Sequence, residues 1–279
     1  MKSGKKGFLQ QIRWGEYSYV ALAVSVLSGL VLALQYDPAT PFYSVSAIDT
    51  LVPFGSFWRS LHFYSSQFFF LLTVCHFIFI YPLSRNLNWR KWSYLTGSLP
   101  VVLLLLFTGY VLRADATGES AGRIAENITL AIPLIGSWIN SLLFSIDADG
   151  LKRVYVNHLI GLGLVWGILC WDHLRRYNLA WKGSGIFVLL MIFVSVIFQA
   201  PMEPEKLGVF NISGPWFFLG LQELLHYIQP FWAGVIFPLT LITALFFLKS
   251  KKWAGRAVIF SCCWLGLYAI LTGLALLRL

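Results

Sequence analysis

Four histidines form two pairs whose spacing is the strongest chemical signal in the sequence. RSLHFYSSQFFFLLTVCH carries His62 and His76, fourteen residues apart, and NHLIGLGLVWGILCWDH carries His158 and His173, fifteen apart. On a helix these separations advance about 21 and 22 Å and return to within about 40° and 60° of the same face. An imidazole in hydrocarbon is costly unless it is used. Each helix is therefore predicted to carry two imidazoles on one face, near opposite membrane surfaces.

One predicted span lies between the two helices, so they run in the same direction and their histidines match in depth. His62 is predicted to meet His158, and His76 to meet His173. Two stacked bis-histidine sites in a helical bundle suit two six-coordinate haems, whereas zinc would need further ligands at each site. The alternatives are interhelical hydrogen bonds, or pore and proton-relay groups. His226 has no partner at such a spacing and is expected at the membrane interface.

Residues flanking the histidines fit the same interpretation. Arg59 precedes His62 by three residues and Arg153 precedes His158 by five, and arginine can pair with a haem propionate. Simple snorkelling to the interface is the alternative for both. A flat macrocycle also needs residues without bulk where it passes a helix, although glycine is common in membrane helices anyway. The candidates are Gly15 and Gly29, again fourteen apart, and Gly97 and Gly109.

Composition indicates the elements that must position these residues. The 279-residue chain is 58% hydrophobic, 17% aromatic and only 12% charged, which is typical of membrane proteins. The predicted fold is an all-α integral membrane protein with seven transmembrane helices, a four-helix dihaem bundle (1–182) followed by three helices (183–279). The apolar runs able to cross roughly 30 Å of hydrocarbon are 17–36, 60–84, 92–112, 154–171, 183–202, 224–248 and 257–277.

The distribution of charge predicts the orientation in the membrane. With the N-terminus in the cytoplasm and the C-terminus outside, 14 of the 21 basic residues lie inside and only Glu16 and Asp172 of the 12 acidic residues do. The net charge of +9 thus mainly reflects basic residues in the cytoplasmic segments of a membrane protein, and nucleic acid is not an expected partner. The first run lacks a cleavage signature and is read as a retained helix. The expected location is the cytoplasmic membrane of a bacterium.

Cysteines and outer loops add further expectations. All four cysteines lie in predicted spans and no C-x-x-C-H occurs, so covalent haem attachment is not expected and they are read as buried small hydrophobes. The loop 113–153 predicts two short surface helices broken at Pro133 and Gly136. The loop 201–230 predicts irregular chain followed by a short interfacial helix in WFFLGLQELLHY.

These residues resemble the cytochrome b subunit of the bc-type quinol:cytochrome c oxidoreductases. R-x-x-H with a second histidine fourteen later, FTGYVL at 107–112, NITLAIPLIG, and Arg153 five before His158 are similar to that family's motifs, over roughly residues 10–250. The fifteen-residue spacing resembles the chloroplast branch, whose four-helix and three-helix parts would be fused here. The resemblance implies two non-covalent haem b groups, an outer one on His62 and His158 and an inner one on His76 and His173, between two quinone sites.

Three departures from the family's pattern stand out. GPWF places Pro215 where the family has the glutamate that takes protons from quinol. Glu223 is the candidate replacement, and the alternative is an interfacial charge facing water. Leu95 stands where a glycine is expected, and the first span has no cysteine for an extra covalent haem.

Residues near the quinone sites follow from loop position. The outer candidates are Tyr110, Trp216, Phe217 and Glu223. The inner candidates are Asp172 and Arg13, although Asp172 at helical spacing from Arg175 or Arg176 could equally be their charge partner.

The motifs, the composition and the resemblance together predict the dihaem subunit of a membrane quinol oxidoreductase complex. Coupling of its electron transfer to proton translocation is a further expectation. Its expected partners are the lipid bilayer, the quinone pool, a second copy of the complex, and an outer c-type cytochrome, multihaem included, or iron–sulfur subunit. One alternative is a non-bifurcating anchor and electron wire for an extracytoplasmic oxidoreductase. Another is a non-redox seven-helix receptor, transporter or channel, although a retinal receptor would want a lysine in 257–277, which has none.

Overall fold

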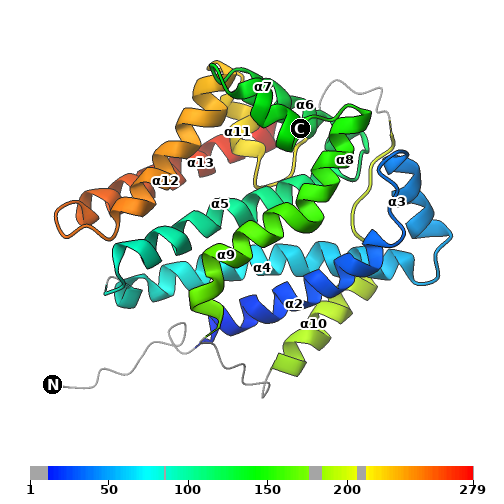
Figure 1. The fold of residues 1–279 in the computed structure, drawn as a ribbon, viewed down its shortest axis with the longest axis horizontal. Helices are drawn as coiled ribbons and strands as arrows, with labels where there is room; N and C mark the ends of the chain where they lie inside the picture. The colour runs from blue at the N-terminus through cyan, green and yellow to red at the C-terminus, as the bar shows by residue number, and fades with distance from the viewer. Residues whose placement is uncertain (1–11, 85, 176–183, 206–211, 279) are drawn as a thin grey trace. The chain divides into compact units, whose positions relative to one another are not determined.

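The computed structural model describes residues 12–84, 86–175, 184–205 and 212–278, and all regular secondary structure in these ranges is helical (Figure 1). The chain divides into two compact units. The first comprises Met1–Tyr36, Ala47–Leu87 and Asp172–Pro201, and the second comprises Asp37–Ser46, Asn88–Trp171 and Met202–Leu279. The predicted boundary at residue 182 lies outside the described residues, so the two-domain division stays a prediction.

The first unit is built on a pair of long helices. α2 (Trp14–Ala33) and α4 (Gly55–Ser84) pack along each other, and α10 (Ser184–Ile197) packs against both (Figure 1). Small residues of α2, including Ala21, Ser25 and Ser28, are buried, and small residues let membrane helices approach closely. A hydrogen bond of 2.8 Å between the Ser18 and Thr73 hydroxyl groups joins α2 to α4.

The second unit contains α5 (Trp89–Val111) and the helices that follow it in the chain. Asn88 caps α5 by accepting from the backbone N–H of Lys91, and Asp115 caps α6 (Ala116–Leu130) by accepting from Gly118. α8 (Ala148–Val156) continues through a π-helical turn (Asn157–Gly161) into α9 (Leu162–Leu174). The division between the units falls within α9, between Trp171 and Asp172.

The remaining helices of the second unit hold its C-terminal part together. They are α7 (Gly136–Ile139), α11 (Leu219–Leu224), α12 (Phe237–Phe247), α13 (Ala254–Leu277) and two further π-helical turns, Asn140–Phe144 and Trp232–Ile236. Trp264 of α13 stacks on Phe237 of α12, with ring centroids 4.5 Å apart. Tyr268 donates to the backbone oxygen of Phe217 at 2.7 Å, which ties α13 to the chain just before α11.

Five helical segments in the described residues are long and apolar enough to cross a membrane: Trp14–Ala33, Gly55–Pro82, Trp89–Val111, Asp149–Leu174 and Ala254–Leu277. The other two predicted spans coincide with shorter apolar helices, Ser184–Ile197 and Trp232–Phe247. The membrane class is therefore confirmed, while the count of seven spans and the four-plus-three plan stay predictions.

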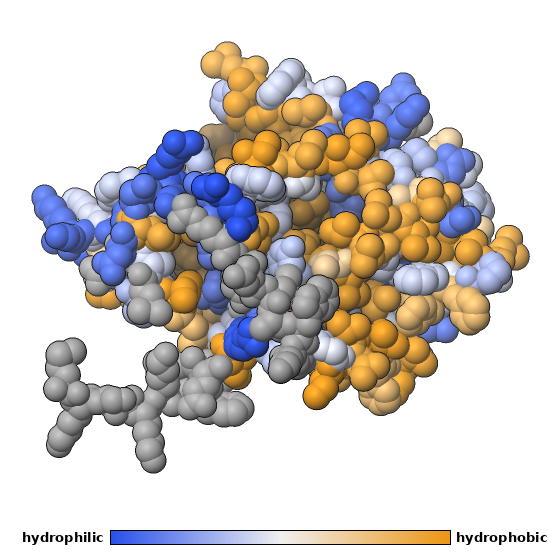
Figure 2. Space-filling model, turned by 60° about the horizontal axis from the view of Figure 1, so that its bottom comes forward, coloured by the Kyte–Doolittle hydropathy of each residue, from blue (hydrophilic) through white to orange (hydrophobic). Residues whose placement is uncertain are grey.

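Apolar side chains dominate the exposed surface of the long helices. Figure 2 shows hydrophobic residues over much of the visible face. Leu27 of α2 is 64% exposed, and Leu164 and Ile168 of α9 are 61% and 70% exposed. Large continuous apolar surfaces are unfavourable in water, so a lipid environment explains why these helices carry leucine and isoleucine on their outer faces.

The loops contain one helix that sequence patterns missed. The predicted breaks at Pro133 and Gly136 are confirmed, because α6 ends at Leu130 and α7 begins at Gly136. A short helix in WFFLGLQELLHY is also confirmed as α11. α3 (Pro41–Thr50), which is divided between the units, was not predicted. The sequence did contain a signal for the start of α3, because Thr40 followed by proline at the first helical position is a helix start pattern.

Candidate functional site

His76 and His173 face each other in the first unit. Their ring centroids are 5.9 Å apart, with the ring planes inclined by 49°. Imidazole nitrogens bind metals at about 2 Å, so two imidazoles on opposite sides of one ion have ring centroids about 6 Å apart. The observed separation therefore suits coordination of a single ion by both rings.

Two glycines of α2 lie directly against histidines of α4. A Cβ atom added to Gly15 would lie 2.8 Å from Cε1 of His76, and one added to Gly29 would lie 2.8 Å from Cε1 of His62. Such contacts are closer than real Cβ atoms make. Any side chain at either glycine would displace the neighbouring imidazole, so the fourteen-residue spacing of the glycines matches that of the histidines in three dimensions.

The tautomer of His62 is set by the backbone of α2. Nδ1 of His62 lies 2.8 Å from the backbone oxygen of Ser25. A carbonyl oxygen only accepts, so Nδ1 carries the proton and Nε2 carries the lone pair that a metal would use. Histidine ligands commonly hold their second nitrogen in this way, which fixes the orientation of the ring and makes the ligand more basic.

His158 of the second unit is held in the same manner by α5. Nδ1 of His158 lies 3.0 Å from Oγ1 of Thr108, whose hydroxyl group donates to the backbone oxygen of Leu104 at 2.8 Å. The hydroxyl therefore accepts from Nδ1, and Nε2 is again the ligating nitrogen. A Cβ added to Gly109 would lie 2.9 Å from Cε1 of His158. Thr108 was missed by sequence reasoning, although it directly precedes Gly109 in FTGYVL.

The local backbone at His158 is also unusual. His158 lies in the π-helical turn Asn157–Gly161, and such turns occur frequently at functional sites. The side chain of Asn157 donates to the backbone oxygen of Leu142 at 2.7 Å, which anchors the turn to the preceding π-helical segment. The wider turn and this anchor set the direction in which α8 and α9 present His158.

These features fit a flat macrocycle ligated by imidazole pairs. The described residues contain no group of three or more histidine, cysteine or acidic side chains placed to hold a metal ion. A bis-histidine haem needs only two protein ligands, because the porphyrin supplies the other four nitrogens. The pairing of His62 with His158 joins residues of different units and stays a prediction.

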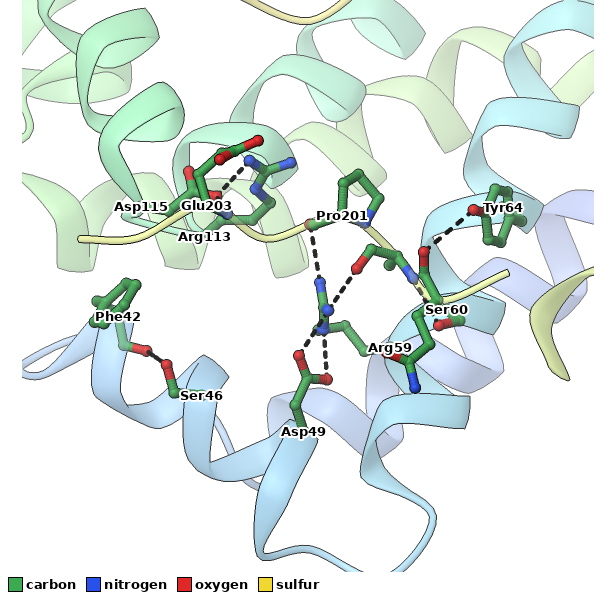
Figure 3. A network of polar contacts seen from close by, with 12 residues as sticks. Phe42, Ser46, Asp49, Arg59, Ser60, Tyr64, Arg113, Asp115, Pro201 and Glu203 are labelled. Carbon is green, nitrogen blue, oxygen red and sulfur yellow. Dashed lines mark hydrogen bonds and ion pairs between the residues drawn. The ribbon is translucent and has the colours of Figure 1, made fainter. Parts of the chain in front are cut away.

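Arg59 has acquired partners that the sequence did not indicate (Figure 3). Its Nε donates to Oδ1 of Asp49 at 2.6 Å, and its Nη2 lies 2.6 Å from Oδ2 of the same carboxylate. Nη2 also donates to the backbone oxygen of Ala200 at 2.7 Å, and Nη1 to that of Pro201 at 3.3 Å. Arg59 thus anchors the chain after α10 to the end of α3, and its predicted propionate role stays a prediction.

Arg153 lies on the exposed side of α8, where its Nε donates to the backbone oxygen of Ser141 at 2.6 Å. The structure thus ties this side chain to the segment that precedes α8. Its predicted pairing with a propionate stays a prediction.

A buried polar network at the end of α5 was also missed. Arg113 forms an ion pair with Asp115, which is completely buried, and donates to the hydroxyl group of Thr117 at 2.8 Å (Figure 3). Asp115 also accepts from the backbone N–H of Gly118 at 2.8 Å and of Glu203 at 2.9 Å. The guanidinium group of Arg113 lies 4.3 Å from the ring centroid of Tyr110. This network holds the C-terminal end of α5 and the start of α6.

The outer quinone candidates lie in the second unit with different exposures. Tyr110 donates to the backbone oxygen of Ser213 at 3.5 Å, and Trp216 is 48% exposed. Glu223 is only 2% exposed, accepts from the Tyr227 hydroxyl group at 2.7 Å and pairs with Arg278 at 3.2 Å. The alternative of a carboxylate facing water is therefore wrong for Glu223, which is a buried acid with a polar surround.

The inner candidates are each paired with a residue three positions away in the chain. Asp172 lies 2.9 Å from Arg175, and both side chains are about half exposed, as the charge-partner alternative predicted. Arg13 forms an ion pair with Glu16, which is 2% exposed and accepts from the Ser184 hydroxyl group at 3.3 Å. Glu16 was not singled out from the sequence because its burial depends on α10.

The described helices place histidines against glycines of neighbouring helices, and hydrogen bonds fix the orientation of two of these rings. An all-helical membrane protein with such histidines belongs to the class of membrane b-type cytochromes. The family model described as cytochrome b/b6/petB matches residues 8–177, and the chain belongs to this family. It is a membrane cytochrome b subunit that acts in electron transfer, and membership implies haem b binding.

Relatives in sequence support this assignment, and a solved structure is similar in fold. The chain is 33% identical over 159 residues to cytochrome b6 of Heliobacterium mobile, which covers 54% of this chain and 74% of that one. It is 32% identical over 162 residues to cytochrome b6 of Heliomicrobium gestii, with the same coverage. A solved structure titled hyperthermophilic respiratory Complex III is similar in fold, with a TM-score of 0.68 at 19% identity over 95% of this chain and 86% of that one.

Proposed function

We propose that this chain is the dihaem subunit of a membrane quinol oxidoreductase complex and carries electrons across the bilayer. The outer haem b is held by His62 and His158 and the inner one by His76 and His173. The observation that carries the proposal is the 5.9 Å separation of the His76 and His173 rings, beside a glycine that leaves room for no side chain. Bound haem supplies reversible one-electron chemistry at each level.

The protein groups have distinct tasks in this mechanism. The Ser25 carbonyl and the Thr108 hydroxyl hold Nδ1 of His62 and His158, so that each ring presents Nε2 as a ligand. Gly15, Gly29 and Gly109 allow the imidazoles to lie against α2 and α5. The apolar helices exclude water from the path between the two levels, which keeps the electron carriers in a low-dielectric interior.

Quinone is the proposed substrate, and its oxidation releases protons that protein groups must accept. On the outer side Tyr110, Trp216 and Glu223 line the proposed site. Glu223 is supported as the proton acceptor by its burial and by its hydrogen bond from Tyr227. On the inner side Asp172 is proposed to supply protons, and its half-exposed position gives it access to water.

Electrons at the outer surface are proposed to pass to or from a partner subunit. The proposed partner is an outer c-type cytochrome, multihaem included, or an iron–sulfur subunit, which agrees with the similarity in fold to a protein titled respiratory Complex III. A homodimer of the complex in the bilayer belongs to the same proposal. The proposed location is a bacterial cytoplasmic membrane with the N-terminus inside and the C-terminus outside. Coupling of electron transfer to proton translocation belongs to this proposal.

A linear electron wire without bifurcated quinol oxidation is the second candidate function. Pro215 favours it, because proline at the position of the family's glutamate has no proton to exchange. In this case the chain would connect one quinone site to an extracytoplasmic oxidoreductase and serve as its membrane anchor.

The haem sites can be tested through the glycines. Gly15→Ala, Gly29→Ala and Gly109→Ala each place a Cβ within 3.0 Å of an imidazole, and overpacking of this kind costs about 1–3 kcal/mol. We expect each purified variant to lose part of its b-type absorbance. Gly266→Ala on α13 is the matched control, because nothing lies within 4 Å of the added atom. Unchanged absorbance in all three variants would contradict the proposed haem positions.

Bifurcation can be tested on the intact complex. Reduced quinone is added, followed by a pulse of strong oxidant, while the b-haem absorbance is recorded. Transient haem reduction after the oxidant would show bifurcated oxidation, and Glu223→Gln should abolish it. Oxidation alone would favour the linear wire.

A further inference from the structure

Arg113 has a buried donor with no partner in the described chain. The residue is 8% exposed, and its Nη2 is occupied by Asp115 and Thr117. Its Nε, by contrast, is buried and makes no hydrogen bond to any described residue. Buried polar groups are nearly always hydrogen-bonded, and a charged group left unpaired is especially unfavourable. This N–H therefore points to an acceptor that the described residues do not supply.

The position of Arg113 indicates which group that acceptor belongs to. Arg113 follows Gly109 by only four residues in the chain. Gly109 lies against His158, and Arg113 lies two residues beyond the end of α5, in a turn where its backbone N–H donates to the oxygen of Tyr110 at 3.3 Å. The turn thus keeps Arg113 close to the end of the helix that contacts His158. The ring of Tyr110 lies under its guanidinium group at 4.3 Å and restricts the directions it can take.

The chemistry of the donor favours an anionic oxygen. Hydrogen bonds from guanidinium to carboxylate are shorter and roughly twice as strong as neutral ones. We infer that Arg113 Nε binds a propionate carboxylate of the outer haem, an inference that rests on the proposed dihaem function. A quinone carbonyl is the neutral competitor for the same N–H.

The other two arginines near the outer histidines are differently placed. All three guanidinium nitrogens of Arg59 donate to Asp49 or to the carbonyls of Ala200 and Pro201. Arg153 is exposed and donates to Ser141. The structure thus assigns the buried carboxylate contact to a residue that sequence spacing did not select.

The test compares Arg113→Gln with Asp115→Asn in the purified complex, by b-haem absorbance and by redox titration of each haem. Arg113→Gln should weaken retention of the outer haem roughly ten- to hundredfold, the range typical when a group supporting a bound ligand is removed. It should also lower the midpoint potential of any outer haem that remains, because a positive charge is lost. Asp115→Asn breaks the same ion pair but keeps Nε, so outer-haem retention should be unchanged.

Folding effects are controlled by the double variant Arg113→Gln/Asp115→Asn, which leaves no buried uncompensated charge. It should lose the outer haem as Arg113→Gln does. Wild-type haem retention and potentials in this double variant would overturn the inference, and so would equal haem loss in Asp115→Asn.

A measurement on the unaltered chain avoids variants altogether. Haem dimethyl ester, which lacks propionate charge, should be retained more weakly than haem by the wild-type protein at the outer site. Equal retention would overturn the inference and leave the neutral quinone contact. If the wild-type protein binds no haem b, the proposed function itself fails, which is a different outcome from two haems that are indifferent to Arg113.

Discussion

Arg59 in the first unit and Arg113 in the second each pair with an aspartate, yet the two guanidinium groups are used differently. Arg59 distributes its nitrogens between Asp49 and two backbone carbonyls that lie about 140 residues away in the chain. Arg113 uses one nitrogen for Asp115 and Thr117 and keeps a buried Nε without a partner in the described chain. An arginine at a suitable spacing is therefore available to a cofactor only if the fold leaves a donor for it.

The largest effect is expected from removing the buried carboxylate of Asp115. Asp115→Ala leaves the charge of Arg113 buried and removes the acceptor of Gly118 and Glu203, so it should destabilise the protein by about 3–5 kcal/mol. Thermal unfolding in detergent measures this. Asp172→Ala is the matched control, because the half-exposed pair with Arg175 should contribute less than about 1 kcal/mol. Similar losses of stability in the two variants would contradict the expectation that the buried ion pair contributes more than the exposed one.

A smaller effect is expected at the aspartate that holds Arg59. Asp49→Ala should cost about 2 kcal/mol, because water reaches this carboxylate, which is 19% exposed, and the carbonyl partners of Arg59 remain. The double variant Asp49→Ala/Arg59→Gln should cost less than the sum of the single losses, since both remove one interaction. Strict additivity in chemical denaturation would show that the pair is not energetically coupled.

Ser60 tests the backbone side of the Arg59 region. Its hydroxyl accepts from the backbone N–H of Ala200 at 2.9 Å, and both residues are buried. Ser60→Ala should cost about 1 kcal/mol, because the N–H loses its acceptor. Ser66→Ala is the control, since the Ser66 hydroxyl only donates to Phe63 one turn earlier on its own helix. Equal melting temperatures for the two variants would rule out an anchoring role for Ser60.

The smallest effect is expected at the exposed pair on α6. Arg123 and Glu119 lie four residues apart, with side chains 65% and 42% exposed. Arg123→Ala should therefore change stability by no more than about 0.5 kcal/mol, and the difference should vanish at high salt. A loss comparable with that of Asp49→Ala would contradict the ranking of these pairs by burial.

The haem candidates were accessible from sequence because helical periodicity is local. A spacing of fourteen residues places His62 with His76 on one face of α4 whatever the rest of the chain does, and the fifteen-residue spacing predicts the same for His158 and His173. The same argument identified Gly15 and Gly29, and the structure shows each against an α4 histidine. The groups that orient the rings were not identified, because a backbone oxygen such as that of Ser25 carries no sequence signal.

The carboxylates show the opposite case. Asp172 was selected as the inner acid, yet it is half exposed, whereas Glu16 is buried under Ser184 of α10. The sequence left two roles for Glu223, in catalysis or as a charge facing water. In the structure its side chain is buried and contacts Tyr227 and Arg278, which excludes the second role. Burial of a charge depends on which segments pack over it, and sequence position alone does not report that.

The sequence by itself determined the membrane class, the all-helical fold and the family, since hydrophobic runs and helical spacing act within single segments. Tertiary structure decided how the polar groups are used: Thr108 orients His158, Arg59 anchors the chain after α10, and Arg113 retains a buried donor. These outcomes depend on contacts between segments far apart in the chain. Hydrogen bonds require partners at about 3 Å, and only the folded chain brings such partners together.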